Sequence, residues 1–208
     1  MREGIFAHWP NRITLVRFLG SLLLFTILSI WGEARPEDVA TWLRFAFFLF
    51  VGIAATDFLD GYLARRNHQV TAFGRVADPF VDKVLVIGSM VFLAVLPWSA
   101  RYFPAWVVVI VVAREFLVTG LRGYVESLGR QFPADWFGKI KMVLQCVAIG
   151  IVMGLVCFPW PGWARSFLEI CAHVFVWLTL ITTLGSGLSY VAKTRRILDS
   201  VEAGGGGV

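Results

Sequence analysis

Six long runs of apolar residues dominate the chain, and short polar segments separate them. The runs extend over residues 13–31, 42–64, 74–97, 103–121, 137–158 and 165–190. A helix needs about 20 mainly apolar residues to cross the hydrocarbon core of a bilayer, and each run is close to that length. The pattern therefore predicts an all-α polytopic membrane protein with six transmembrane helices and a short N-terminal interfacial segment.

The composition agrees with this interpretation, because 58% of the residues are hydrophobic and 16% are charged, whereas soluble proteins average roughly 25% charged residues. Five further runs follow the first, so we expect the first to remain as a helix and not to be removed as a signal peptide. Residues 1–200 are expected to form a single domain, and residues 201–208, which include four glycines in a row, a flexible tail.

Basic residues are distributed unevenly between the two ends of the runs. Of the 19 Lys and Arg residues, one side of the predicted bundle receives four: Arg35, Arg44, Arg101 and Arg165. The positive-inside rule then puts both termini in the cytoplasm. The net charge of +5 follows mainly from this topology and suits anionic lipid headgroups, so it does not indicate a nucleic-acid partner. Four tryptophans fall at the outer ends, as an aromatic belt would place them: Trp31, Trp98, Trp160 and Trp163.

Three residues bear on where individual helices begin. Asn11 and Thr14 precede or open the first run, and we expect them to cap that helix, with cytidine binding as the alternative. Pro79 removes a backbone hydrogen bond if it lies inside a helix. The third helix is therefore expected either to begin late or to kink there.

Four aspartates interrupt the second and third runs, where carboxylates are most unfavourable. These two runs are joined by a tight polar turn near residue 69, which predicts a helical hairpin with its tip in the cytosol. Asp57 and Asp60 share one face of the first helix, and Asp78 and Asp82 share one face of the second. Four carboxylates at matching depths would repel each other strongly in a low dielectric, so we expect cations between them.

Carboxylate ligands without a nearby His or Cys favour hard ions, first Mg²⁺, with Mn²⁺ and Ca²⁺ as alternatives. The aspartates form two predicted tiers about 5 Å apart along the helices. This spacing fits a site with two divalent ions that clamp a phosphoryl group during in-line displacement. Phosphoryl transfer is the predicted chemistry.

Residues between the aspartates fit a site for a bulky diphosphate ligand. Gly61, Ala64 and Gly74 leave room near the carboxylates, although small residues also serve close helix packing. Arg65 could grip a diphosphate with paired donors, or act as a positive-inside anchor. Thr71 could bond a ligand or cap the third helix.

A second set of charged residues lies near the inner ends of the fourth and fifth runs and suits an acceptor that carries a phosphate. It consists of Arg114, Arg122, Lys139 and Lys141. Arg114 is the most informative, because a cation within "VVVIVVAREFLVTG" needs a partner or a wet cavity. Glu115 is adjacent in sequence but is expected to point elsewhere on the helix. The alternative is that all four basic residues are orientation signals.

The stretch from residue 57 to residue 82 reads D-x2-D-G-x2-A-R-x8-G-x3-D-x3-D, and it resembles the signature of the CDP-alcohol phosphotransferase family. The resemblance implies that Asp57, Asp60 and Asp78 are metal ligands. It implies that Asp82 lies near the metals and is the base that deprotonates the acceptor hydroxyl. It also implies that four residues contact the CDP moiety: Gly61, Arg65, Thr71 and Gly74.

Outside the signature, "PNRITLVR", "VAREFLVTGLRG" and "FGKIKMVLQ" resemble the members of that family that join CDP-diacylglycerol to sn-glycerol 3-phosphate. The resemblance implies these two substrates, with phosphatidylglycerophosphate and CMP as products. It also implies a homodimer in the bacterial inner membrane, with the active site facing the cytoplasm.

Three alternatives remain open. Within the family, the acceptor could be inositol phosphate or a neutral alcohol such as serine. A cation transporter would also place aspartates in a membrane, but the outer halves of the runs carry almost no polar side chains. A polyprenyl transferase also uses aspartate-bound Mg²⁺, although the G-x2-A-R and G-x3-D-x3-D spacing argues against it.

Overall fold

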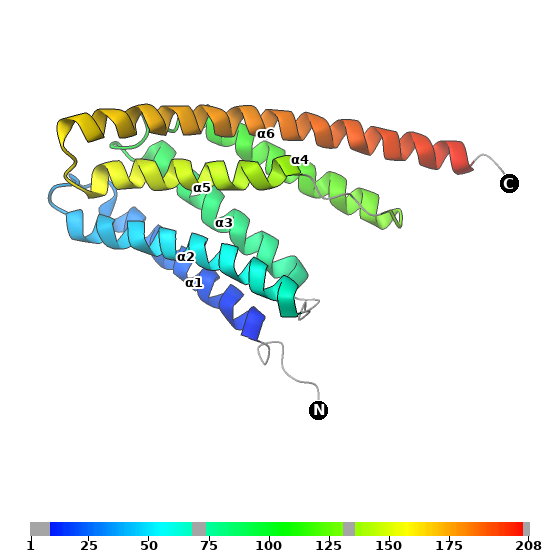
Figure 1. The fold of residues 1–208 in the computed structure, drawn as a ribbon, viewed down its shortest axis with the longest axis horizontal. Helices are drawn as coiled ribbons and strands as arrows, with labels where there is room; N and C mark the ends of the chain where they lie inside the picture. The colour runs from blue at the N-terminus through cyan, green and yellow to red at the C-terminus, as the bar shows by residue number, and fades with distance from the viewer. Residues whose placement is uncertain (1–8, 68–73, 131–135, 206–208) are drawn as a thin grey trace.

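The computed structural model describes residues 9–67, 74–130 and 136–205, and these form six α-helices (Figure 1). Their bounds are α1 Trp9–Trp31, α2 Ala40–Asn67, α3 Gly74–Val95, α4 Ala105–Ser127, α5 Trp136–Cys157 and α6 Gly162–Gly205. Within these ranges the chain forms helices and short connections and no strand. The predicted all-α class and the number of helices are therefore confirmed.

The helix ends differ from the apolar runs where polar residues continue a helix. α1 begins before residue 13, and α4 and α6 extend well past residues 121 and 190. α6 includes residues 201–205, so the flexibility of the tail stays a prediction. Pro79 lies inside α3, and the helix begins at Gly74, which excludes a late start.

Three stretches in the described part of the chain are long and apolar enough to cross a membrane: residues 11–31, 140–157 and 162–199. α2 contributes a shorter apolar stretch, residues 40–56. The protein therefore has the helices of a membrane protein, while six complete spans remain a prediction.

The helices run back and forth, so their connections gather at two ends (Figure 1). We call one the loop end, which holds residues 32–39, 96–104 and 158–161. The other is the terminal end, where α1 begins, α6 ends, and α2 and α4 connect to their successors. α1 packs against both α2 and α3, and α5 packs against α2, α3 and α6, while α4 lies against α3 and α6.

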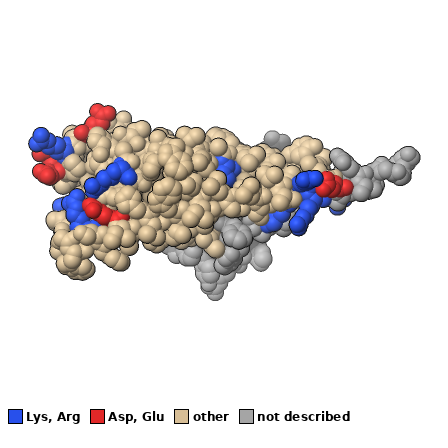
Figure 2. All heavy atoms as spheres, turned by 90° about the horizontal axis from the view of Figure 1, so that it is seen from above, with Lys and Arg blue, Asp and Glu red and all other residues tan. Residues whose placement is uncertain are grey.

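The lateral surface is apolar, as expected for a protein surrounded by lipid. Large hydrophobic residues such as Phe116 and Leu188 are more than 70% exposed, which is unusual on this scale for a soluble monomer. Figure 2 shows charged side chains gathered at both ends of the visible face, with few between them. The interior holds fully buried residues such as Leu28, Phe50 and Met90.

The interior changes character along the helices. On α1, the buried positions Leu24 and Leu28 near the loop end are apolar, and the same face continues towards the terminal end as Asn11, Thr14, Arg17 and Ser21. On α6, Ala172 and Val176 are buried near the loop end, and the face then continues as Thr179, Thr183, Ser186, Tyr190 and Thr194. Both polar faces point into the bundle at the terminal end, which is where the aspartates lie.

Two glycines set local geometry that positions these elements. Gly129 has φ of 72° just after α4, and its N–H bonds to the Glu126 carbonyl while that of Arg130 bonds to the Val125 carbonyl. This is the Schellman arrangement that ends a helix. Gly88 on α3 lets α1 approach closely, because a Cβ there would lie 2.2 Å from Cζ of Phe25.

Candidate active site

The signature aspartates lie at the terminal end, on two consecutive helices. Asp57 and Asp60 fall in the last three turns of α2, and Asp78 and Asp82 in the first three turns of α3. The side chains of Asp57, Asp60 and Asp78 lie outside the part of the chain that the structure describes. Their predicted pairing in two tiers therefore stays a prediction, and Asp82 is the aspartate whose surroundings can be stated.

Asp82 forms an ion pair with Arg17 of α1, whose Nη2 donates to Oδ1 of the carboxylate. The side chain of Arg17 is 5% exposed and that of Asp82 is 21% exposed. In the sequence, Arg17 is one of the fifteen basic residues on the side predicted to be cytoplasmic, and the positive-inside argument did not predict this contact. The available signal was the spacing of Asn11, Thr14, Arg17 and Ser21, which puts four polar residues on one helix face.

The interpretation of Asn11 and Thr14 as caps is wrong. α1 begins at Trp9, so both residues lie inside the helix, and they are 2% and 5% exposed. A cap must stand at the first non-helical position, where its side chain reaches free backbone N–H groups. Their place on the same face as Arg17 leaves the ligand-binding alternative open.

The residues predicted to hold the CDP moiety surround the α2–α3 connection. Gly61, Ala64 and Arg65 belong to α2, and Gly74 is the first residue of α3. Thr71 and the side chains of the other four lie outside the described residues. The backbone thus brings Gly61, Ala64, Arg65 and Gly74 to the same end as the aspartates, and the contacts of all five residues stay predictions.

Arg114 and Lys141 meet at Glu115. Nη1 of Arg114 donates to Oε1 of Glu115 at 2.8 Å, and Nζ of Lys141 from α5 donates to the same oxygen. All three residues are at most 9% exposed. The expectation that Glu115 points away from Arg114 is wrong, because a long guanidinium side chain can curl back to a neighbouring carboxylate when both are buried together.

Arg122 and Tyr190 extend this cluster towards α6. Nη2 of Arg122 donates to the Tyr190 hydroxyl at 3.0 Å, and the guanidinium carbons of Arg122 and Arg114 lie 5.9 and 5.5 Å from the centre of the Tyr190 ring. Three of the four predicted acceptor residues therefore converge. The side chain of the fourth, Lys139, lies outside the described residues.

Lys83 joins the acidic and basic halves of the site, and sequence reasoning did not select it. It follows Asp82 on α3, its Nζ donates to the Thr119 hydroxyl of α4 at 2.5 Å, and it lies within electrostatic range of Arg114 and Arg122. Tyr190 was also missed, although its spacing from Thr183 and Ser186 continues a polar face of α6.

The chemistry of this end fits anionic ligands beside divalent cations. Within the described residues no three His, Cys, Asp or Glu side chains are close enough to hold a metal ion, and the side chains of three of the four predicted ligands are not among those described. The predicted ligand set is all carboxylate, which suits Mg²⁺ or Mn²⁺. Next to it, Arg114 and Lys141 both bond to Glu115, while Arg122 bonds to Tyr190 and Lys83 to Thr119. Four cations around one carboxylate, two of them buried, leave an excess of positive charge that suits a phosphate.

Comparison with known proteins agrees with this geometry. Residues 7–185 match the sequence profile described as CDP-alcohol phosphatidyltransferase. A Bacillus subtilis protein named CDP-diacylglycerol–glycerol-3-phosphate 3-phosphatidyltransferase is 32% identical over 201 residues, covering 91% of this chain and 96% of the relative. A Rickettsia felis protein of the same name is 33% identical over 187 residues, covering 90% and 95%. A Mycobacterium tuberculosis protein named probable phosphatidylglycerophosphate synthase is 31% identical over 199 residues, covering 94% and 85%.

Proposed function

Because this chain belongs to the CDP-alcohol phosphatidyltransferase family, we propose that it transfers the phosphatidyl group of CDP-diacylglycerol to sn-glycerol 3-phosphate. The products are phosphatidylglycerophosphate and CMP. The names of the relatives support this choice of substrates. The structural observation that carries it is the group of buried Arg114 and Lys141 and exposed Arg122 beside the aspartate end, because a neutral acceptor would not need three cations.

The proposed reaction begins with Asp82 as the base. Its carboxylate accepts the proton of the acceptor 1-hydroxyl, the hydroxyl oxygen attacks the β-phosphorus of CDP-diacylglycerol, and CMP leaves with the α-phosphate. Arg17 holds the carboxylate of Asp82 in place from α1. Asp57, Asp60, Asp78 and Asp82 would hold two divalent ions, Mg²⁺ first, which would stabilise the negative charge that develops on the phosphates.

The two substrates use different sets of side chains. Gly61, Ala64 and Gly74 leave room for the CDP moiety, and Arg65 and Thr71 contact it. Arg114, Arg122, Lys139 and Lys141 bind the phosphate of the acceptor, with Tyr190 keeping Arg122 in place and Glu115 keeping Arg114 and Lys141 in place. Lys83, between the two groups, would face both phosphates.

The assay that tests the proposal gives the purified protein labelled CDP-diacylglycerol with each acceptor in turn. We expect CMP release and a lipid product with glycerol 3-phosphate, and far less with inositol phosphate or serine. Preference for serine or inositol phosphate would overturn the acceptor assignment. CMP release that requires the acceptor also separates this activity from cation transport.

We propose further that all six helices cross the bacterial plasma membrane, with both termini and the aspartate end in the cytoplasm. The distribution of basic residues supports this orientation. In a cysteine-free background, Glu33→Cys at the loop end should react with a membrane-impermeant maleimide in intact cells, and Ser127→Cys should react after lysis. The reverse labelling pattern would invert the topology.

The protein is also proposed to work as a homodimer, as the family resemblance implies. Mass measurement of the protein in detergent tests this state. A mass equal to one chain plus bound detergent would contradict it.

A further inference from the structure

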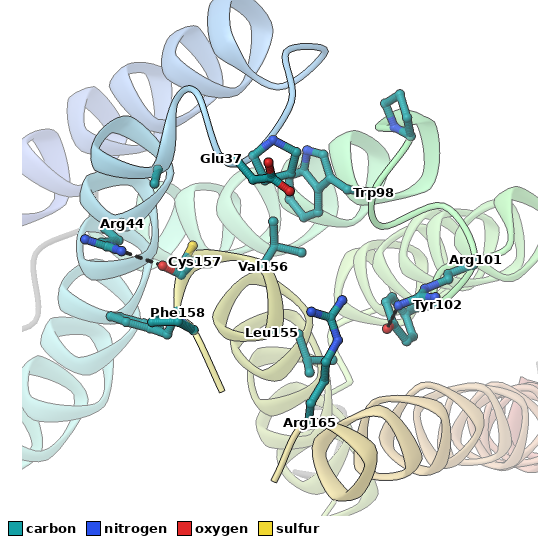
Figure 3. A pocket seen from close by; sticks show the side chains of 14 residues that line it. Glu37, Arg44, Trp98, Arg101, Tyr102, Leu155, Val156, Cys157, Phe158 and Arg165 are labelled. Carbon is teal, nitrogen blue, oxygen red and sulfur yellow. Dashed lines mark hydrogen bonds between the residues drawn. The ribbon is translucent and has the colours of Figure 1, made fainter. Parts of the chain in front are cut away.

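A cavity lined by several charged residues lies at the loop end, far from the aspartates. It has a volume of about 490 Å³ and is enclosed by the start of α2, the α3–α4 connection and the α5–α6 connection (Figure 3). Arg44, which lines it, and Asp57 are both on α2, thirteen positions apart, which corresponds to about 20 Å along the helix. This cavity is therefore separate from the candidate active site.

Three arginines surround the cavity: Arg44, Arg101 and Arg165. They come from three different segments, and Figure 3 shows Arg165 directed towards its centre with Arg44 and Arg101 on either side. They are also three of the four basic residues that the sequence puts on this side of the bundle. Where basic residues are scarce, their convergence on one cavity indicates a role other than orientation.

The three guanidinium groups are held in place by neighbouring groups. Nε of Arg44 donates to the Cys157 carbonyl at 2.9 Å. Arg101 and Arg165 both bond to Oε1 of Glu169, at 2.9 and 3.4 Å, and their side chains remain more than half exposed. Glu169 thus organises two arginines while leaving them accessible to a ligand.

Tyr102 supports the same arrangement. Its hydroxyl donates to Glu169 at 3.2 Å, and burial raises the pKa of this hydroxyl above its ordinary value, so it stays protonated. Among the lining residues Glu37 is the acidic one. Even with Glu169 counted, the three arginines leave an excess of positive charge. Guanidinium groups in such numbers suit a phosphate, which they bind with paired donors.

An apolar groove adjoins this cavity. It has a volume of about 510 Å³, follows α5 between α2 and α6, and is lined by residues such as Val51, Gly150, Gly154 and Leu168. Phe158 lines both the groove and the polar cavity, so the two spaces meet at its ring. A Cβ at Gly150 would meet nothing within 4 Å, which shows that the floor of the groove is open there.

We propose that the cavity and the groove together bind one anionic glycerophospholipid, in the leaflet opposite to the aspartate end. Its phosphate lies among Arg44, Arg101 and Arg165, and one acyl chain follows the groove along α5. A free phosphate would leave the apolar groove without a function, and an uncharged apolar ligand would not need the arginines. Trp98 lines the polar cavity and Trp160 lines the apolar groove. Tryptophan is enriched at the depth of the lipid headgroups.

The test measures lipid retention by the purified full chain. The protein in detergent is titrated with dioleoyl-phosphatidylglycerol, dioleoyl-phosphatidylcholine or inorganic phosphate, and bound molecules are counted by native mass spectrometry. We expect the wild type to prefer phosphatidylglycerol. Arg165→Gln should weaken its retention about tenfold, the loss of one charge-assisted contact. Arg35→Gln is the matched control, because Arg35 is exposed at the same end and does not line the cavity.

Two further variants separate headgroup from chain. Gly150→Leu should weaken retention of both lipids by filling the groove, whereas Gly185→Leu, on an exposed part of α6, should not. Arg44→Gln should resemble Arg165→Gln, and thermal unfolding confirms that each variant is folded, since Arg44 also joins α2 to the end of α5.

Retention of phosphatidylglycerol by Arg165→Gln and Arg44→Gln at the wild-type level would overturn the proposal. So would arginine-dependent binding of inorganic phosphate together with arginine-independent binding of the lipid, since the site would then take the free ion. The measurement requires no turnover. Its failure is therefore distinct from a failure of the proposed transferase activity, which the acceptor assay tests alone.

Discussion

Arg17 and Asp82, 65 positions apart in the chain, form an ion pair that joins α1 to α3 at the polar end of the bundle. The guanidinium is almost fully buried and the carboxylate is more open. α1 therefore supplies a cation to the carboxylate that the sequence signature marks as the base, and the geometry of that carboxylate depends on how α1 packs against α3.

Loss of the Arg17 cation should destabilise the protein. Removing one partner of a buried ion pair leaves the other charge uncompensated and typically costs about 3 kcal/mol or more. Arg17→Gln should lower the thermal unfolding midpoint in detergent clearly. Arg12→Gln, an exposed position on the same helix, should change stability by less than about 0.5 kcal/mol. Equal midpoints for the two variants would show that the Arg17–Asp82 pair has no structural role.

Asp82→Asn should abolish turnover, and it should also lower the unfolding midpoint, because it removes the negative charge that is paired with the buried Arg17 cation. The amide keeps the shape of the side chain and can still accept a hydrogen bond from Arg17, but it cannot take the acceptor proton. Loss of a general base lowers the rate about 10²- to 10⁴-fold. Phosphatidyl transfer by the purified variant measures this. Asp38→Asn at the loop end is the control, and full activity of Asp82→Asn would remove Asp82 from the role of base.

Lys141→Gln should affect one substrate selectively. Lys141 is buried at Glu115 beside Arg114, where we propose that the acceptor phosphate binds. The KM for glycerol 3-phosphate should rise about tenfold, the effect of one lost charged hydrogen bond, while the KM for CDP-diacylglycerol stays nearly constant. Arg130→Gln, exposed beyond α4, should alter neither value. A parallel rise in both KM values would argue for a structural effect.

Chelation should stop the reaction reversibly. Four carboxylates without divalent ions would repel each other and could not neutralise a diphosphate. Incubation with excess EDTA should therefore abolish CMP release, and added Mg²⁺ or Mn²⁺ should restore it. Turnover that persists after complete chelation would contradict the proposed mechanism.

Close packing of α1 on α3 can be tested at Gly88. A Cβ there meets the ring of Phe25 at 2.2 Å, and overpacking costs about 1–3 kcal/mol. Gly88→Ala should therefore lower the unfolding midpoint. Gly185→Ala, with no atom within 4 Å of the new Cβ, should raise it slightly because alanine favours helices by about 1 kcal/mol. Equal changes of the unfolding midpoint in the two variants would show that the Phe25 ring can move aside without a cost in stability.

Hydropathy was sufficient to predict six helices, since their apolar runs are long. It placed helix ends poorly, because α4 and α6 continue past their apolar runs through polar residues, and on α6 the buried face accommodates one of them, Thr194. Asn11 was assigned to a cap for the same reason: the apolar run begins after the helix does.

For the candidate site, fixed spacing placed the aspartates at the ends of α2 and α3. Spacing could not predict pairs between helices that are distant in sequence, such as Arg17 with Asp82 or Lys83 with Thr119. Glu115 was misjudged because the direction of Cβ was taken to fix the reach of two long side chains. The contact between Arg114 and Glu115 forms because both are buried together with Lys141, which α5 supplies.

The length of α6 bears on how the acceptor reaches its site. From Trp163 to Tyr190 the helix rises about 40 Å, while the hydrocarbon core is about 30 Å thick. If Trp163 marks one membrane interface, Tyr190 lies beyond the opposite edge of the hydrocarbon core. Water-soluble glycerol 3-phosphate could then bind at Arg122 without losing its hydration in lipid, whereas the lipid substrate approaches from the side.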